Sequence, residues 1–289
     1  MQYVQPLFRP PSEAESLILQ VTLGCSHNRC TFCSMYRTKR FQTRPLKQVE
    51  ADIRESRALM GAGVRRVFLA DGDAMCLSTR RLLDLLAPIN AAFPALQRVS
   101  AYANARDILR KSDAELAQLR DQKLRLLYMG LESGDEQTLR HIQKGATPDE
   151  IAQAARRAEA AGLAVSVMVL IGLGGKERSL EHARASARVI NAMAPTFTAL
   201  LTYTPVPGTP FHDELERGDI ELPSPQGSLA EIRAFLADLA CTTYFTCTHA
   251  SNYLPLRGKM PEARHGLLSL LDAAIRGEVP LRPEFLRGL

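Results

Sequence analysis

Residues 17–36 read LILQVTLGCSHNRCTFCSMY, an apolar run that leads directly into three closely spaced cysteines. The first six residues, 17–22, predict a β-strand. Cys25, Cys30 and Cys33 follow in the loop after that strand. In α/β barrels the active site lies at the carboxyl ends of the strands, so this loop is where chemistry is expected.

The alternation of strand and helix continues along the chain. Further strands are predicted at 67–70, 98–102, 124–129, 164–171 and 197–203, with helices at 46–60, from 78 to about 89, from 112, from 147 to 162, and at 179–193. Ser78 is expected to cap its helix, and the helices that begin at Ser112 and Thr147 each carry a Glu three residues later, the spacing of a capping box. Six such units predict a parallel sheet that curls toward a barrel. We therefore expect an α/β fold: a partial (β/α)6 TIM-type barrel over residues 1–212, and a C-terminal, mainly helical extension over 213–289 without a clear strand pattern.

Composition narrows the class of protein. The 46% hydrophobic content of these 289 residues is enough for a core, and no apolar run approaches the roughly 20 residues that cross a bilayer. The start of the chain lacks the pattern of a signal peptide, so we expect a cytoplasmic protein without a membrane partner. Trp is absent, which argues against a stacking surface for single-stranded nucleic acid. The densest basic stretch, Arg37, Lys39 and Arg40, is either a solvated loop or a site for an anionic ligand.

Three thiolates on one loop can hold three irons of a [4Fe-4S] cluster and leave the fourth iron open to another ligand. An electron-transfer ferredoxin would use four cysteines. The same residues together with His27 could instead form a structural zinc site of the Cys3His type. Three more cysteines are scattered and are predicted to be buried thiols: Cys76, Cys241 and Cys247.

The cysteine segment resembles the motif of the radical S-adenosylmethionine (radical SAM) superfamily, in which C-x3-C-x2-C carries an aromatic residue before the last Cys. Phe32 fills the aromatic position, but four residues separate Cys25 from Cys30, giving C-x4-C-x2-C. The resemblance runs from about Leu17 to Phe211. It implies a [4Fe-4S] cluster on Cys25, Cys30 and Cys33, S-adenosylmethionine (SAM) as second cofactor, and a one-electron reductant such as flavodoxin or ferredoxin.

The activity implied by this resemblance is reductive cleavage of SAM to a 5′-deoxyadenosyl radical, which takes a hydrogen atom from a substrate that the sequence does not identify. Two alternatives remain at this point. One is non-radical alkyl transfer from SAM, and the other is a zinc-stapled binding protein without catalysis.

Polar residues and glycines follow successive predicted strands, where the resemblance implies contacts to SAM. They are Asp71, Gly72 and Asp73 in the place of the family's Gly-Gly-Glu motif, Tyr102 and Asn104 after the third strand, Glu132 after the fourth, Gly172 after the fifth and Tyr203 after the sixth, with Phe32 in the cysteine loop. The alternative is that the carboxylates cap helices and Gly172 serves a tight turn. Their shared position at strand ends favours the site.

A polar segment, residues 249–255, follows the predicted barrel. We expect His249, Asn252 and Tyr253 to close the open side of the partial barrel and to contact substrate. The alternative is a simple connection between two helices.

Overall fold

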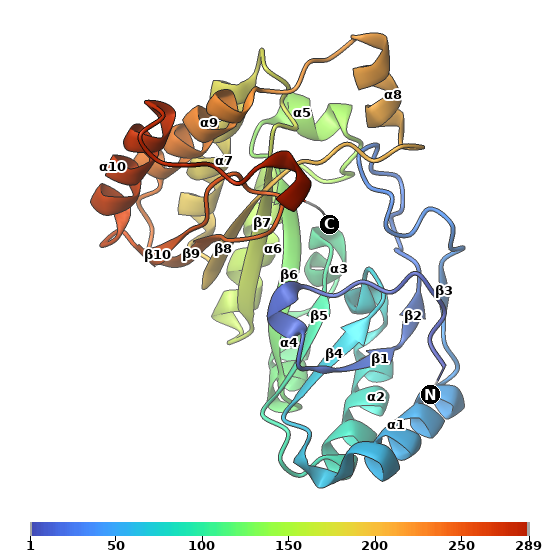
Figure 1. Ribbon diagram of the computed structural model, residues 1–289. Helices are drawn as coiled ribbons and strands as arrows, with labels where there is room; N and C mark the ends of the chain where they lie inside the picture. Colours follow the sequence, from blue (N-terminus) through green and yellow to red (C-terminus); the bar gives the residue numbers. More distant parts are fainter. Residues whose placement is uncertain (1, 288–289) are drawn as a thin grey trace. The chain divides into compact units, whose positions relative to one another are not determined.

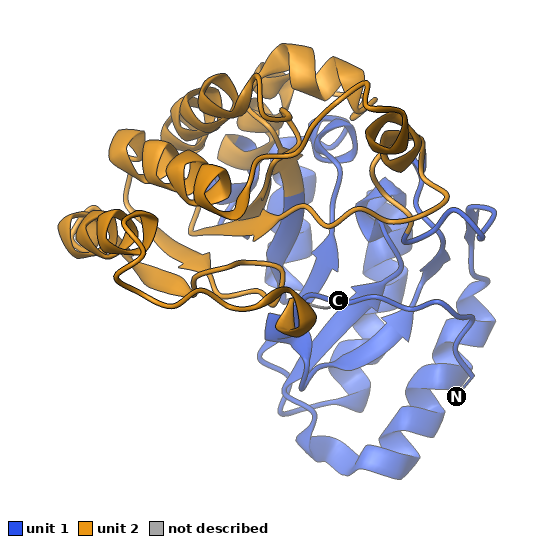
Figure 2. Ribbon diagram, turned by 45° about the horizontal axis from the view of Figure 1, so that its top comes forward, with its two compact units in different colours: residues 1–28, 35–129, 157–165 blue, residues 29–34, 130–156, 166–289 orange. Residues whose placement is uncertain are grey.

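The computed structural model describes residues 2–287 (Figure 1). The chain forms two compact units, coloured separately in Figure 2. The first unit comprises Met1–Asn28, Met35–Met129 and Arg157–Val165, and the second comprises Arg29–Ser34, Gly130–Arg156 and Ser166–Leu289. The predicted boundary after residue 212 divides the chain once, whereas each of these units combines several segments of the chain. That boundary stays a prediction.

The strands form an eight-stranded, mostly parallel sheet, as the predicted α/β fold class requires. Among the described pairs of this eight-stranded sheet, β9 and β10 are antiparallel and the others are parallel. In sheet order the strands are β1 (Leu17–Gln20), β4 (Arg66–Ala70), β5 (Arg98–Tyr102), β6 (Leu124–Glu132), β7 (Ala164–Ile171), β8 (Phe197–Thr202), β9 (Thr243–Cys247) and β10 (Leu256–Met260).

In the first unit, β1 is buried at every position and β4 at all but its first. Parallel strands that are covered on both faces need such continuous apolar runs, because no face is left to water. Helices α1 (Leu46–Met60) and α2 (Thr79–Ala92) pack together beside these strands. The Ser78 hydroxyl caps α2, and a capping box at Ser112 begins α4 (Asp113–Asp121), both as predicted.

In the second unit, α7 (Ser179–Met193) packs against α9 (Pro225–Asp238), which packs against α10 (Arg264–Ile275) (Figure 1). The predicted capping box at Thr147 also forms, with Thr147 and Glu150 exchanging side-chain-to-amide hydrogen bonds at the start of α6 (Pro148–Ala160). The six predicted barrel strands all form, and α7 has its predicted bounds.

The segment after residue 212, expected to be mainly helical, contains two strands that were not predicted, β9 and β10. Strand β9 continues the sheet in parallel with β8, so this segment is not purely helical. Its partner β10 reads LRGKM, and its central Arg, Gly and Lys are typical of a loop. Such residues are tolerated on the last strand of a sheet, where one side faces solvent.

Four shorter elements were also missed: the two-stranded ladder described below, α3 (Ala105–Leu109), α5 (Glu136–His141) and α8 (Pro210–Arg217).

Across residues 2–287, the structure contains no helix with the length and apolarity that a membrane crossing demands.

Candidate functional site

The cysteine loop is bracketed by two short strands, β2 (Thr22–Leu23) and β3 (Gln42–Thr43), which pair in antiparallel fashion. Cys25, Cys30 and Cys33 are all partly exposed, and none is joined in a disulfide. The Cys33 amide donates to the Cys30 carbonyl oxygen at 3.3 Å, so these two lie on one turn. Within the described chain, no group of three or more His, Cys, Asp and Glu side chains is placed to hold a metal ion.

The chemistry of this donor set suits an iron–sulfur cluster. Thiolates are the usual ligands of such clusters, and partial exposure lets iron and sulfide reach them. The turn that carries Cys30 and Cys33 is itself fixed within the second unit. The Thr31 amide donates to the Ile142 carbonyl oxygen at 3.0 Å, and the Thr31 carbonyl accepts from the Phe211 amide at 3.2 Å.

Asp71 anchors both ends of the cysteine loop within the first unit. Its fully buried carboxylate accepts from the Gly24 amide at 2.9 Å and from the Lys39 ammonium at 2.8 Å. Gln20 donates to the same carboxylate at 3.0 Å. The basic stretch is therefore not one surface: Lys39 is buried against Asp71, whereas Arg37 and Arg40 are exposed.

Gly72 lies where the strand end meets the cysteine loop. A Cβ atom at this position would come within 2.7 Å of the Tyr36 ring and 2.9 Å of the Cys25 Cβ. Its amide donates to the Gly24 carbonyl oxygen at 3.1 Å. Only glycine allows this close approach of backbone to loop.

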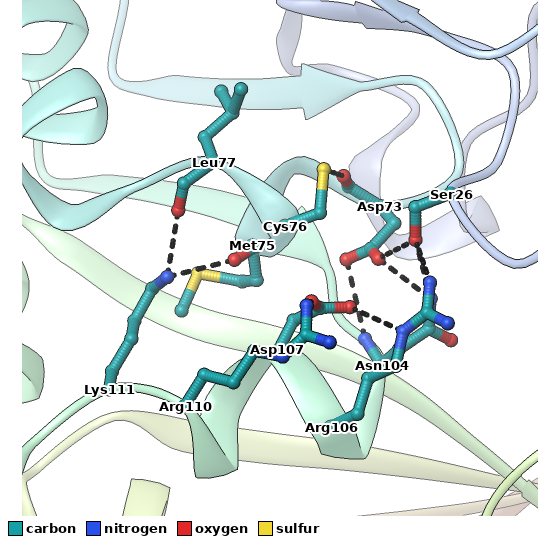
Figure 3. A network of polar contacts seen from close by, with 10 residues as sticks. All are labelled: Ser26, Asp73, Met75, Cys76, Leu77, Asn104, Arg106, Asp107, Arg110 and Lys111. Atoms are coloured by element: carbon teal, nitrogen blue, oxygen red, sulfur yellow. Dashed lines mark hydrogen bonds and ion pairs between the residues drawn. The ribbon is translucent and has the colours of Figure 1, made fainter.

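Asp73, also fully buried, lies in a polar network in the first unit (Figure 3). Its carboxylate accepts from the Ser26 hydroxyl at 2.5 Å and from the Asn104 amide group at 2.7 Å, so the structure brings two predicted site residues together. Arg106 also donates to the Ser26 hydroxyl, at 2.8 Å. Burial, reinforced by the neighbouring Asp107 carboxyl, raises the pKa of Asp73 to about 7. Asp73 makes no capping hydrogen bond, so that alternative is wrong for it.

Two more residues belong to this network: Cys76, which was predicted to be a buried thiol but is partly exposed, and Lys111, which was not assigned from the sequence. The Cys76 thiol donates to the Asp73 carbonyl oxygen at 3.0 Å, and burial raises its pKa to about 12. Lys111 donates to the carbonyl oxygens of Met75 and Leu77, and burial lowers its pKa (Figure 3). Ser26, Arg106 and Lys111 were missed because common surface residues give no signal until the fold assembles them.

Tyr102 belongs to an aromatic cluster in the first unit. Its ring meets Phe68 edge-on, with centroids 5.2 Å apart, and Tyr128 at 6.1 Å. The structure leaves Tyr102 half-buried at the end of β5.

Glu132 ends β6 in the second unit with a left-handed backbone, φ +63°. Its largely buried carboxylate accepts from Lys144 at 2.9 Å. A Cβ atom at Gly130 would lie 1.7 Å from the Glu132 carboxylate oxygen, so glycine there makes room for this ion pair. The helix that follows, α5, is capped by Asp135, whose carboxylate accepts from the Thr138 amide at 3.0 Å. The capping alternative is therefore wrong for Glu132 as well.

A cavity of about 170 Å³ lies at the carboxyl ends of β7 and β8. It is lined by Gly172 and Tyr203, both predicted to contact cofactor, and by Tyr253, predicted to contact substrate. Glu284 and Arg287 line it too, and the sequence analysis missed them. Tyr253 donates to Glu284 at 2.8 Å, and the Arg287 guanidinium stacks 3.5 Å above the Tyr253 ring.

The other predicted residues of the second unit lie around these elements. Phe32 packs edge-on against Tyr203, with ring centroids 6.5 Å apart. Asn252 is fully buried and tied to β8: it donates to the Leu200 carbonyl oxygen and accepts from Thr202, both at 2.9 Å. Half-buried His249 lies 2.9 Å from the Ser251 hydroxyl, and burial lowers its pKa.

The remaining two cysteines have ordinary packing roles. Cys247 is fully buried in β9, as predicted, and burial raises its pKa. Cys241 is partly exposed, so the prediction of a buried thiol is wrong for it, and its thiol donates to the Ile190 carbonyl oxygen at 3.6 Å.

Comparison with known proteins gives one relative of known sequence and several of known structure. An uncharacterized protein of Methanopyrus kandleri is 29% identical over 197 residues, which are 64% of this chain and 37% of the relative. The chain thus matches little more than a third of that relative's length.

Among solved structures, coproporphyrinogen III oxidase (HemN) from Escherichia coli, a radical SAM enzyme, superposes with a TM-score of 0.57 at 19% identity, covering 79% of this chain and 53% of HemN. Methylornithine synthase (PylB) gives 0.56 at 17% identity, covering 89% and 68%. The methyltransferase TsrM from Kitasatospora setae gives 0.57 at 20%, covering 70% and 39%. At such identities the likeness shows the fold, and it confirms the predicted partial-barrel class.

The family profile of the Radical SAM superfamily matches residues 19–187, more than half of the chain and including all three cysteines of the loop. Members of this superfamily are enzymes that bind a [4Fe-4S] cluster and SAM. The chain therefore belongs to the radical SAM superfamily.

Proposed function

We propose that this enzyme holds a [4Fe-4S] cluster on Cys25, Cys30 and Cys33 and cleaves SAM reductively. The observation that carries the proposal is the set of three partly exposed thiols on one loop inside the family match. When bound, the cluster and SAM would supply a 5′-deoxyadenosyl radical for hydrogen abstraction. The chain's own residues hold the cofactors, exclude water and present the substrate.

The proposed SAM contacts fall into two groups, one in each unit. In the first unit they are the strand-end residues Asp71, Gly72, Asp73, Tyr102 and Asn104; in the second unit they are Phe32, Glu132, Gly172 and Tyr203. The structure supports different roles within the first group. For Asp71 and Gly72 we propose that they fix the cysteine loop and do not themselves contact SAM, since the Asp71 carboxylate is fully buried and occupied by Gly24 and Lys39.

The substrate side of the proposal rests on the 249–255 segment. Tyr253 lines the cavity at the ends of β7 and β8, which supports a contact with substrate. His249, earlier in the same segment, is half-buried. Asn252 holds the segment in place through its hydrogen bonds to β8. We propose flavodoxin or ferredoxin as the reductant. We propose the cytoplasm as the location, because thiols without disulfides are typical of a reducing compartment.

Anaerobic reconstitution with iron and sulfide, followed by reduction with SAM present, tests the proposal. We expect 5′-deoxyadenosine and methionine in equal amounts. An alkylated product with S-adenosylhomocysteine, and no 5′-deoxyadenosine, would contradict radical cleavage and show alkyl transfer. A colourless protein that retains stoichiometric zinc would contradict the cluster and show a structural zinc site.

A further inference from the structure

His182 on α7 and Glu231 on α9 are both fully buried and face each other. The His182 Nδ1 atom lies 2.9 Å from Glu231 Oε1, which is ion-pair distance, although the geometry is not that of a hydrogen bond. On the other side of the ring, Nε2 lies 3.2 Å from the carbonyl oxygen of Glu132. Both ring nitrogens thus lie near acceptor oxygens. A neutral imidazole has one N–H only, so the charged imidazolium is the form that suits both neighbours.

The Glu231 carboxylate serves more than one partner. Its Oε1 accepts from the Gly172 amide at 3.0 Å, and its Oε2 accepts from the Ser179 hydroxyl at 2.5 Å. One side chain of α9 therefore joins the end of β7 to the first turn of α7. Through His182, it also reaches the end of β6.

The two backbone positions held in this way both have a positive φ. Glu132 has φ +63°, which costs free energy for any residue with a Cβ atom, and Gly172 has φ +95°, which glycine adopts without strain. The strained backbone of Glu132 persists only where the surroundings fix it. The Glu132 carbonyl oxygen faces the imidazole, and the Gly172 amide donates to the carboxylate.

We infer that His182 and Glu231 are positioning residues, which act as a buried ion pair to set the backbone of the two second-unit strand ends proposed to contact SAM. The inference rests on the proposed function, since that function assigns Glu132 and Gly172 to the cofactor. A contribution to the stability of the fold is not a sufficient reason for this ion pair. Apolar residues can often replace a buried ion pair without lowering the free energy of unfolding.

The charge on His182 is consistent with every group that faces it. Burial alone would lower its pKa, but the Glu231 carboxylate, the Glu132 carbonyl oxygen and Asp135 together outweigh this effect, so the pKa of His182 is raised. Asp135 is itself paired with Arg178 at 2.9 Å.

The charge can be measured without cofactor. In the cofactor-free protein, the ¹⁵N shifts of the His182 ring, identified by their absence in His182→Gln, should show both nitrogens protonated at neutral pH. In Glu231→Gln the ring should become neutral at the same pH. A neutral His182 ring in the parent protein would overturn the inference, whatever the enzyme's reaction.

The positioning role is measured by SAM affinity in titration calorimetry. Glu231→Gln should weaken SAM binding roughly tenfold, the effect of about one misplaced hydrogen bond to a charged ligand. Glu231→Asp, which keeps the carboxylate, should recover part of the loss. Arg233→Gln is the matched control, because Arg233 lies on the same helix in an exposed pair with Asp272.

The outcomes separate the inference from the proposed function. If the parent binds SAM and Glu231→Gln binds it equally well, the pair has no positioning role and the inference fails alone. If Arg233→Gln weakens binding as much as Glu231→Gln, the effect belongs to α9 in general, and the inference also fails. A folded, reconstituted parent that binds no SAM would overturn the proposed function together with the inference.

Discussion

Asp71 in the first unit and Glu231 in the second have the same local arrangement. Each is a fully buried carboxylate that accepts from the amide of a glycine with positive φ, Gly24 or Gly172, and each faces a buried cation, Lys39 or His182. They differ in where they come from. Asp71 directly follows strand β4 and is 47 residues from Gly24, whereas Glu231 lies on helix α9 and is 59 residues from Gly172. A strand-end carboxylate can therefore orient the loop that follows its neighbouring strand.

The largest effect should come from breaking the first pair. Asp71→Ala leaves the Lys39 ammonium buried without its partner, so we expect a loss of about 3–5 kcal/mol in the free energy of unfolding, measured with urea. The matched control is Glu15→Ala, which breaks an exposed pair with Arg66 and should change stability by about 0.5 kcal/mol or less. Equal losses in the two variants would contradict the anchoring role of Asp71.

Two glycines next to strand-end carboxylates sharpen the comparison: Gly72, which follows Asp71, and Gly130, which lies against Glu132. Gly72→Ala pushes a methyl group against the Tyr36 ring and the Cys25 Cβ, so it should destabilise the protein by about 1–3 kcal/mol. In Gly130→Ala the new methyl group contacts only the flexible ends of Glu132 and Lys144, which can move apart. We therefore expect a loss of about 1 kcal/mol in the free energy of unfolding. Thermal unfolding of both variants measures the difference, and a larger loss for Gly130→Ala would reverse the assignment of rigid and adaptable contacts.

SAM affinity distinguishes the two remaining strand-end carboxylates. Glu132→Gln weakens the pair with Lys144 but changes no contact of the cysteine loop. SAM binding should therefore weaken by about 1–3 kcal/mol while the iron content is unchanged.

Asp73→Asn disturbs the hydrogen bond to Ser26, which is next to Cys25, and should lower both the SAM affinity and the iron content. Glu136→Gln, an exposed neighbour, is the control. Unchanged SAM affinity for both Glu132→Gln and Asp73→Asn would remove these residues from the cofactor site.

The sequence predicted regular structure well and side-chain partners poorly. Buried parallel strands and capping boxes are local patterns, so β7 and the Thr147 box were predicted correctly. The edge strand β10 was missed, because its polar centre is tolerated only in its tertiary position. Asp71 was recognised by its place after a strand, but its partner Lys39 looked like part of a surface cluster. His182 and Glu231 gave no signal, since a single His or Glu on a helix is ordinary until packing buries it.

A smaller effect is expected in the cavity of the second unit. Tyr253→Phe removes the hydrogen bond to Glu284 and should cost about 1 kcal/mol of stability. If Tyr253 contacts substrate, the variant should still form 5′-deoxyadenosine but convert less substrate per SAM cleaved. Turnover and coupling equal to those of the parent would make the 249–255 segment a connector.

Iron bound per chain after anaerobic reconstitution tests the central claim most directly. The parent should hold about four irons with matching sulfide, and the Cys25→Ala, Cys30→Ala, Cys33→Ala variant should remain folded and hold no such cluster. Cys241→Ala with Cys247→Ala should keep the parent's iron. A triple variant that retains four irons per chain would contradict the assignment of the cluster to this loop.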